Sequence, residues 1–326
     1  MDFNSLPPDA NLDAEVLRMY RLQYDGNPVY RGFADCLGRK PAAVASVMDI
    51  PFLPISFFKS HVVACGEGPF EQTFESSGTT GASTSRHFVK DLSHYRTSFR
   101  GAFRLFYGDP ADWCILALLP SYLERRGSSL VMMADELIGM SGDPGSGFYL
   151  DQFEALASAL RMNEEKGRKT LLLGVTFALL DFAERHPMPL GHTVVMETGG
   201  MKGRRRELTR EEVHERLCKA FSIDAVHSEY GMTELLSQAY SKGRGLFHTP
   251  PWMRVLLRSE DDPLSMLDAD GKPLQSGLIN VIDMANRHSC SFIATDDLGR
   301  IHPGGGFEVV GRLDNSDIRG CSLLAV

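Results

Sequence analysis

A segment rich in hydroxyl groups and glycine is the part of this sequence best suited to chemistry. Glycines let backbone N–H groups turn inward to form an anion-binding concavity, and serine and threonine hydroxyls add neutral donors. The residues are Ser76, Ser77, Gly78, Thr79, Thr80 and Gly81. We therefore interpret the segment as a site for polyphosphate, although a surface turn uses the same residue types for backbone reasons.

The flanks of this segment predict a hairpin. A Walker loop needs a lysine after its last glycine and a helix immediately downstream. Here residues 82–85 lead instead into Arg86-His87-Phe88-Val89-Lys90, where polar and apolar residues roughly alternate. Such alternation is typical of a strand, so we expect the glycine segment at the tip of a β-hairpin.

Other catalytic and metal motifs are missing from the sequence. The cysteines show neither a CxxC pair nor Cys/His ligand spacing, which disfavours structural zinc and, in a cytosolic protein, disulfides. There is also no Ser/His/Asp order and no GxSxG elbow that would support a hydrolase. The six cysteines are Cys36, Cys65, Cys114, Cys218, Cys290 and Cys321.

Composition sets broader limits. The chain has 326 residues, 43% of them hydrophobic and 23% charged, as in an ordinary globular enzyme. Its formal charge of −8 argues against long nucleic acid as a partner, because the one basic run is Lys202-Gly203-Arg204-Arg205-Arg206. We interpret that run as a solvated loop, with steering of an anionic nucleotide or partner as the alternative.

The sequence shows no targeting signal. The amino terminus lacks a basic start and an apolar core, so we expect a cytoplasmic protein. The longest apolar stretch, near residues 171–182, is shorter than the roughly 20 residues that a membrane helix needs, so no membrane span is expected.

The elements that must position the loop alternate along the chain. Apolar runs at 113–119, 169–173, 192–196 and 224–227 alternate with helical patterns, which predicts a largely parallel α/β sheet. Helices are expected over the first 60 residues, where Pro51 and Pro54 exclude a central strand. Further helices are predicted near 148–166, 177–185 and 209–221, and after Asp91 or Ser93, where Tyr95, Phe99, Phe103 and Phe106 recur at helical spacing.

Beyond Gly245 the pattern changes to short strand candidates, such as 252–258 and 277–283, which turn signals separate. This predicts a small, mostly β subdomain. We therefore divide the chain into an α/β core with a helical amino-terminal segment, residues 1–243, and a β-rich subdomain with a tail, residues 244–326.

Four segments occur in an order that resembles the acyl-adenylate-forming superfamily of AMP-dependent synthetases and ligases. They are Ser76–Gly81, Glu229–Glu234, Thr295–Asp297 and Gly311–Asp314. Acyl-CoA synthetases, luciferases and peptide-synthetase adenylation domains belong to this superfamily. The resemblance implies its large-domain α/β fold, ATP and Mg²⁺ as cofactors, and a carboxylic acid as substrate.

The resemblance also implies roles for individual residues. The loop Ser76 to Gly81 would hold the β- and γ-phosphates of ATP. Tyr230 would offer a flat face to adenine, Gly231 would permit close backbone approach, and Thr233 would donate to the α-phosphate. Glu234 would supply a hard oxygen to Mg²⁺.

Four more positions match the superfamily's nucleotide site. Asp297 would accept hydrogen bonds from the ribose hydroxyls, and Arg312 would contact ribose and phosphate through its planar fork. Gly199 and Gly200 would line the adenine and acyl pocket. Without the resemblance, Asp297 and Arg312 read equally as surface ion-pair residues, and the two glycines as a tight turn.

Within the superfamily, the chain is most similar to the acyl-protein synthetase (LuxE-type) branch of the bacterial luminescence system. Members hold the activated fatty acid as a thioester on a cysteine near the carboxyl end, which Cys321 matches, and pass it to a reductase partner. A thiolate is the reactive form, and Arg319 would favour it; a buried thiol is the alternative. The matching segments are 53–54, 58–61, 85–87, 121–125, 128–130, 174–176, 197–200 and 319–322.

The pattern departs from the superfamily in three respects. The chain ends soon after Asp314, so we expect the mobile domain with its catalytic lysine to be absent or vestigial, with Lys202 or Arg204 as substitutes. The loop lacks the Pro-Lys that often follows it, and Asp296 stands where many members have glycine. A CoA or carrier-protein ligase and a non-catalytic nucleotide-binding homologue are therefore the alternatives to an acyl-protein synthetase.

Overall fold

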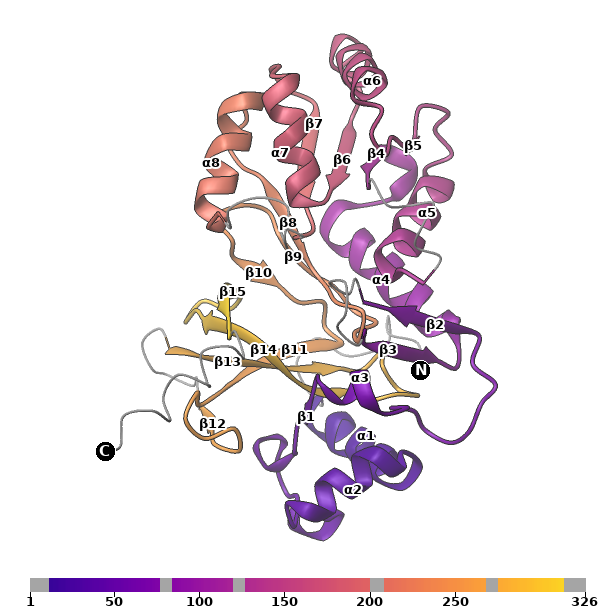
Figure 1. Cartoon of the computed structure of the whole chain (residues 1–326), viewed down its shortest axis with the longest axis vertical. Helices are drawn as coiled ribbons and strands as arrows, with labels where there is room; N and C mark the ends of the chain where they lie inside the picture. The colour runs from indigo at the N-terminus through magenta and orange to yellow at the C-terminus, as the bar shows by residue number, and fades with distance from the viewer. Residues whose placement is uncertain (1–11, 77–83, 120–126, 200–207, 268–274, 314–326) are drawn as a thin grey trace, which may run out of the picture.

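A computed structural model describes residues 12–76, 84–119, 127–199, 208–267 and 275–313. Figure 1 shows an α/β unit above and a unit of long twisted strands below, with the amino-terminal helices at the bottom. One hydrogen-bonded path of strands, β12-β11-β13-β14-β15-β10-β9-β8-β7-β6-β4-β5, runs through both units.

The upper unit is a parallel sheet between two helical layers. Strands β4, β6 and β7 are buried along most of their length, as apolar strands covered on both faces should be. Alternate residues of β4 and β6 join two separate cores, one with α4 and α5 and the other with α6, α7 and α8. The strands are β4 (Cys114–Leu118), β5 (Gly147–Phe148), β6 (Thr170–Gly174), β7 (Thr193–Glu197) and β8 (His227–Tyr230), and the helices are α4 (Leu92–Tyr107), α5 (Ser129–Ser141), α6 (Phe153–Glu165), α7 (Thr176–Arg185) and α8 (Arg210–Phe221).

The sheet continues downward through antiparallel strands. The turn between β9 and β10, where Ser241 pairs with Phe247, carries the path from one unit to the other. The division at residue 243 falls in this turn and stays a prediction. The strands are β9 (Ala239–Ser241), β10 (Phe247–His248), β11 (Met253–Arg258), β12 (Met266–Leu267), β13 (Gln275–Asp283), β14 (Phe292–Ile301) and β15 (Phe307–Arg312).

The amino-terminal segment is fixed to the lower unit. Buried Gln23 donates from Nε2 to the carbonyl of Asn286 and accepts from the N–H of Ser291, at 3.0 and 2.8 Å. The two-residue strand β1 pairs in parallel with β14, and the N–H of Ile55 donates to Ala294. Its elements are α1 (Leu12–Gly26), α2 (Pro28–Cys36), the short 3-10 turns η2 (Pro41–Ala43) and η3 (Val47–Asp49), β1 (Leu53–Pro54) and α3 (Phe57–Ser60). A third 3-10 turn, η4 (Pro110–Asp112), lies between α4 and β4 in the upper unit.

The predicted hairpin is present on both sides of the glycine loop. Strand β2 (Gln72–Glu75) pairs antiparallel with β3 (Arg86–Val89) in a sheet of its own. The N–H of Ser76 donates to the Ser85 carbonyl at 3.0 Å, and the N–H of Ser85 donates to the Ser76 hydroxyl at 2.9 Å. These bonds hold the base of the loop closed.

Two element boundaries differ from the prediction, and one helix was not predicted. The strand placed at 224–227 is β8, which begins at His227 and carries Tyr230 at its end. The helix expected from 148 begins at Phe153, because Gly147 and Phe148 pair with β4 as β5. Helix α5 was not predicted, because its apolar residues surround the helix and give a weak amphipathic period.

Candidate nucleotide and acid site

Three of the residues predicted to contact adenosine lie together, although up to 82 positions separate them in the sequence. The hydroxyl of Tyr230 donates to Oδ2 of Asp297 at 2.9 Å. Oδ1 of Asp297 lies 3.6 Å from Nε of Arg312, and these two residues are directly paired between β14 and β15. The sheet register therefore places an aspartate, an arginine and a tyrosine at one point.

The ring of Tyr230 is packed into the lower core. Its centroid lies 5.8 Å from that of Phe247 and 5.4 Å from that of Phe307, and the residue is 8% exposed. Burial and the charge of Asp297 raise the pKa of Tyr230 well above its ordinary value. Its hydroxyl is thus a fixed donor that orients Asp297, and the predicted stacking on adenine stays a prediction.

Glu234 connects this cluster to the hairpin. Its side chain is 5% exposed, and burial raises the pKa of the carboxyl. A hydrogen bond from Ser85, at the base of the glycine loop, and the charges of Arg312 and Lys59 partly offset that rise. The predicted metal ligand, the phosphate hairpin and the ribose cluster therefore lie within electrostatic reach of one another.

The chemistry of Glu234 fits a divalent cation. Among the described residues no lysine, arginine or histidine forms a salt bridge with it, so that part of the chain provides no direct counter-ion for its negative charge. A buried carboxylate without a cation is costly, and Mg²⁺ prefers one or two carboxylates together with substrate phosphates. Thr233, the preceding residue, is partly exposed beside it.

The sequence analysis missed the residues that hold Thr233 and Glu234 in place. Nδ1 of His87, on β3, lies 2.8 Å from the Thr233 carbonyl and donates to it in the tautomer protonated there. Nδ2 of Asn286 donates to the Glu234 carbonyl at 2.7 Å. His87 is fully buried, and burial lowers its pKa to about 4, so it is neutral at pH 7.

A buried aspartate fixes the residues that follow Glu234. Asp283, at the end of β13, accepts from the N–H groups of Leu236, Ser237 and Ala285 at 2.7, 3.1 and 3.0 Å. Because Asp283 is fully buried, these backbone N–H groups replace the hydrogen bonds that water would otherwise donate to its carboxylate. The segment after β8 is thus held from both β3 and β13.

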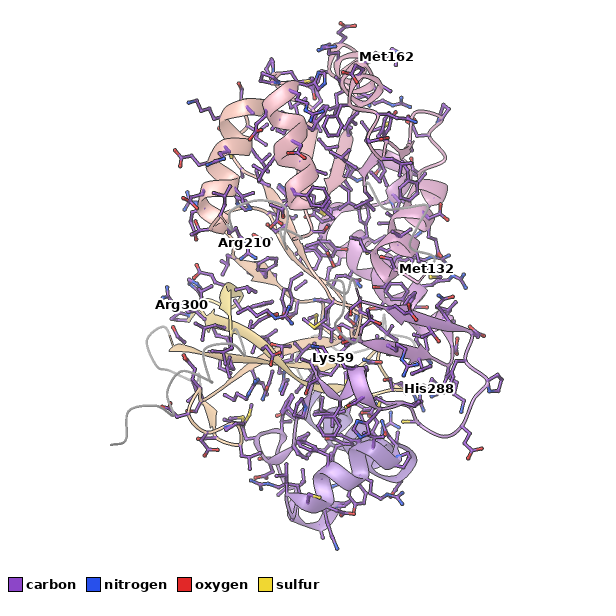
Figure 2. The ribbon with its side chains drawn as sticks, viewed as in Figure 1. Lys59, Met132, Met162, Arg210, His288 and Arg300 are labelled. Carbon is purple, nitrogen blue, oxygen red and sulfur yellow. The ribbon has the colours of Figure 1, made fainter. Side chains whose placement is uncertain are left out.

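Lys59 is a second residue that the sequence analysis did not assign. Phe58, the preceding residue on α3, packs edge-on against the ring of His87 with centroids 5.6 Å apart. Lys59 is exposed, and no hydrogen bond or ion pair to it occurs among the described residues. Figure 2 shows it in the middle of the molecule, where α3 meets the hairpin. The segment 58–61 had been noted only for its resemblance, which was the available signal.

Gly199 is held at the end of β7 by a buried glutamate. Its N–H donates to Oε2 of Glu197 at 2.8 Å, and the same oxygen accepts from the Thr176 hydroxyl at 2.9 Å. The backbone of Gly199 has φ of +74°, a conformation that favours glycine. The other predicted residues, Ser77, Gly78, Thr79, Thr80, Gly81, Gly200 and Cys321, and also Lys202 and Arg204, lie outside the described residues.

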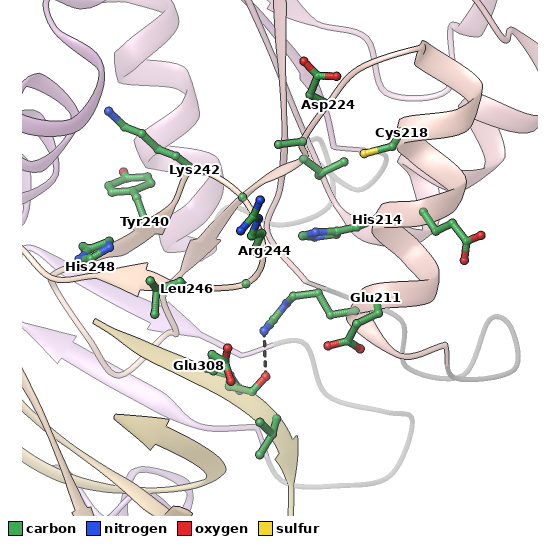
Figure 3. Close-up of a pocket in the computed structure, with 18 of the residues that line it drawn as sticks. Glu211, His214, Cys218, Asp224, Tyr240, Lys242, Arg244, Leu246, His248 and Glu308 are labelled. Atoms are coloured by element: carbon green, nitrogen blue, oxygen red, sulfur yellow. Dashed lines mark hydrogen bonds between the residues drawn. The ribbon is translucent and has the colours of Figure 1, made fainter. Parts of the chain in front are cut away.

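A large cavity lies beside the site rather than in it. It has a volume of about 940 Å³ and is bounded by α8, the β9–β10 turn and β15. Figure 3 shows its mixed lining of acidic, basic and histidine side chains, among them Glu211, His214, Lys242 and Arg244. None of the predicted nucleotide residues lines it.

Comparison with known proteins identifies the fold. Neither a protein-family model nor a curated protein sequence matches the chain. Among solved structures, a fatty acid AMP ligase from Legionella pneumophila aligns with a TM-score of 0.52 at 15% identity, over 78% of this chain and 53% of that one. A long-chain fatty acid CoA ligase from Archaeoglobus fulgidus aligns with a TM-score of 0.51 at 14% identity, over 74% of this chain and 51% of that one.

The chain has the adenylate-forming fold. The predicted α/β architecture of the large domain is therefore confirmed. The chain spans about half the length of these two structures. A luciferase-like enzyme from the mealworm Zophobas morio aligns with a TM-score of 0.49 at 16% identity, over 77% of this chain and 60% of that one. At these identities the likeness establishes the fold alone. No helix among the described residues is both long and apolar enough to span a membrane.

Proposed function

We propose that this chain is an ATP- and Mg²⁺-dependent ligase that joins a carboxylic acid to AMP and then passes the acyl group to a thiol. One observation carries the proposal: Glu234, Asp297 and Arg312 meet at the base of the glycine hairpin, through Ser85 and Tyr230. The fold supports it, since a fatty acid AMP ligase and a fatty acid CoA ligase are among the solved structures that align with a TM-score above 0.5.

The described residues suit adenylation because this reaction needs alignment and charge screening more than proton transfer. The nucleophile is a carboxylate, already ionised at neutral pH. Its oxygen forms a bond to the α-phosphorus while the bond to the leaving pyrophosphate breaks, so two anions must be brought together in line. Mg²⁺, held by Glu234, would neutralise phosphate charge.

The chain's own groups would supply the rest. Asp297, oriented by Tyr230, would accept from the ribose hydroxyls, and Thr233 would donate to the α-phosphate. Arg312 and Lys59 place positive charge near Glu234, and Lys59 is the cation without a described partner. We assign to Lys59 a charge-screening role, in place of Lys202 or Arg204 as the substitute for the catalytic lysine of the mobile domain.

For the second half-reaction we retain Cys321 as the proposed acceptor, as in the acyl-protein synthetase branch. Its thiolate would attack the acyl carbonyl and AMP would leave, forming a thioester. A reductase or a carrier protein would then receive the acyl group. A CoA or carrier-protein thiol is the alternative first acceptor.

The decisive experiment follows the two half-reactions separately. ATP–pyrophosphate exchange is measured with a panel of carboxylic acids, and intact-protein mass is recorded for the wild type and Cys321→Ser before and after hydroxylamine. We expect acid-dependent exchange in both proteins and a hydroxylamine-labile adduct on the wild type alone. Exchange without an adduct would move the acceptor to CoA or a carrier; nucleotide binding without exchange would leave a non-catalytic homologue.

A further inference from the structure

The two faces of β8 carry different chemistry. Successive residues of a strand point to opposite faces. Ser228 contacts Nε2 of His214 on α8, and Tyr230 belongs to the same face. Glu229 lies between them and points to the other face, toward α4, where its charge acts on Tyr95 and Tyr107. The residue next to the ribose cluster is therefore directed away from it.

Around Glu229 lies a group of polar side chains with atoms that have no hydrogen-bond partner among the described residues. We call it the polar row: Thr198, Glu229, Gln238 and Tyr240. Tyr240 pairs directly with Glu229 across β8 and β9, and Thr198 follows Glu197, which pairs with Ser228. The Tyr240 hydroxyl, Oε1 of Gln238 and Oγ1 of Thr198 are buried atoms with no hydrogen-bond partner among the described residues.

The carboxyl of Glu229 is also without a partner. No described residue donates a hydrogen bond to it or forms a salt bridge with it. The nearby cation Lys242 packs instead over the ring of Tyr107, at 5.6 Å from its centroid. Burial, with a contribution from the charge of Glu197, raises the pKa of Glu229 to about 8.

Gly231 makes room for this carboxyl. A Cβ atom at Gly231 would lie 2.3 Å from Oε1 of Glu229, which is closer than real Cβ contacts. The glycine that precedes Thr233 and Glu234 thus brings a carboxyl against the backbone of the reacting segment. The polar row and the nucleotide cluster are two sides of the same strand end.

Buried polar atoms without a partner among the described residues need an explanation, and so does the half-buried carboxyl of Glu229 beside them; a bound ligand is one. The polar row is rich in acceptors: a carboxyl, an amide oxygen and two hydroxyls. A plain alkyl chain would leave all of them unsatisfied. An ammonium group offers three donors and no acceptor, and its charge favours ionisation of Glu229.

We propose that the acid which this chain activates carries an amino group, and that Glu229, Gln238 and Tyr240 bind its ammonium form. This inference rests on the proposed function and names its substrate class. It departs from the expectation of a plain fatty acid. Glu229 is then a specificity-determining residue. It lies on the opposite face of β8 from Tyr230, because successive side chains of a strand point to opposite faces.

The test uses pairs of acids that match in size and differ in charge. ATP–pyrophosphate exchange is measured for leucine against 4-methylpentanoate and for 6-aminohexanoate against heptanoate. We expect the amino member of at least one pair to exceed its neutral partner by about a hundredfold in kcat/KM, because a site built for hydrogen bonds rejects analogues that lack them. Glu229→Leu should reduce or reverse that ratio.

Two further variants keep the result interpretable. Glu229→Gln retains the shape and should lose most of the amino preference, while Glu165→Gln, an exposed glutamate on α6, should behave as the wild type. Preference for neutral acids in every pair, or equal losses for both members in Glu229→Leu, would overturn the inference and leave the proposed function intact. If no acid supports exchange although ATP binds, it is the proposed function that fails.

Discussion

Two glutamates on neighbouring strands have opposite surroundings. Glu197, at the end of β7, is 5% exposed; burial alone would raise its pKa, but hydrogen bonds from His214, Gly199 and Ser228 and the charge of Arg210 lower it to about 2. Glu229, one strand away on the other face, has no described donor, and burial raises its pKa to about 8.

The contrast is the one expected between a structural carboxyl group and carboxyl groups that we propose to be functional. Glu197 accepts from several donors, and it fixes the Gly199 turn and the start of α8. Among the described residues neither Glu229 nor Glu234 forms a salt bridge, and these two glutamates flank Tyr230 and Thr233. A buried carboxyl that costs stability is expected where a ligand completes its surroundings.

Glu234 provides the most severe test of this distinction. Replacement by Gln removes the proposed Mg²⁺ ligand but keeps the shape, so we expect acid-dependent exchange to fall by about 10² to 10³, as for loss of one preorganised electrostatic group. The midpoint temperature of thermal unfolding should be no lower than in the wild type, because the substitution removes a buried charge. Unchanged exchange would show that Glu234 is structural like Glu197.

Glu197→Gln should give the opposite result from Glu234→Gln, because it should lower the stability of the fold. We expect the free energy of unfolding at pH 7 to fall by about 3 kcal/mol, the equivalent of its pKa shift from 4.5 to about 2. The folded-state pKa is depressed, so this contribution is present above pH 4.5 and is lost as pH falls toward 2. Urea unfolding of both proteins between pH 3 and 7 measures this contribution. If the free energy of unfolding of the variant falls as steeply with decreasing pH as that of the wild type, Glu197 does not make it.

Glu229→Gln should stabilise the protein at alkaline pH. The pKa of Glu229 is raised from 4.5 to about 8, so its contribution is full below pH 4.5 and is lost as pH rises through 8. At pH 9 we expect the variant to be more stable by at least about 2 kcal/mol, less than the full shift because the amide also lacks partners. Equal stability of both proteins from pH 5 to 9 would mean that Glu229 has a partner.

Lys59→Met should give the smallest effect. Removing an exposed cation near Glu234 is expected to lower kcat for exchange by about tenfold, with stability unchanged, since a charge in solvent-exposed surroundings is partly screened. Lys40→Met, an exposed lysine before η2, is the matched control. If both variants retain wild-type kcat across ionic strengths, Lys59 has no part in charge screening.

Residue patterns predicted the fold and part of the candidate site. Buried apolar runs separated by amphipathic helices specified the parallel sheet, because covered strands must be apolar on both faces. Tyr230, Asp297 and Arg312 were predicted as nucleotide ligands from the resemblance of short motifs to a known superfamily, and the structure brings the three together. The start of β8 was placed three residues too early, at Asp224, because the apolar residues Ala225 and Val226 come just before the strand begins at His227.

The amino-acid sequence by itself determined the layers and the hairpin flanks, which depend on local periodicity, while the candidate nucleotide ligands came from the resemblance of its short motifs to the acyl-adenylate-forming superfamily. Tertiary structure alone decided that Lys59 lies near Glu234, that His87 and Asp283 hold the intervening segment, and that Glu197 is partnered while Glu229 is not. Those facts depend on which strands are neighbours and which face each side chain takes. Pairing and register arise from contacts between segments up to 240 residues apart, such as Leu53 with Ile293, which no local pattern records.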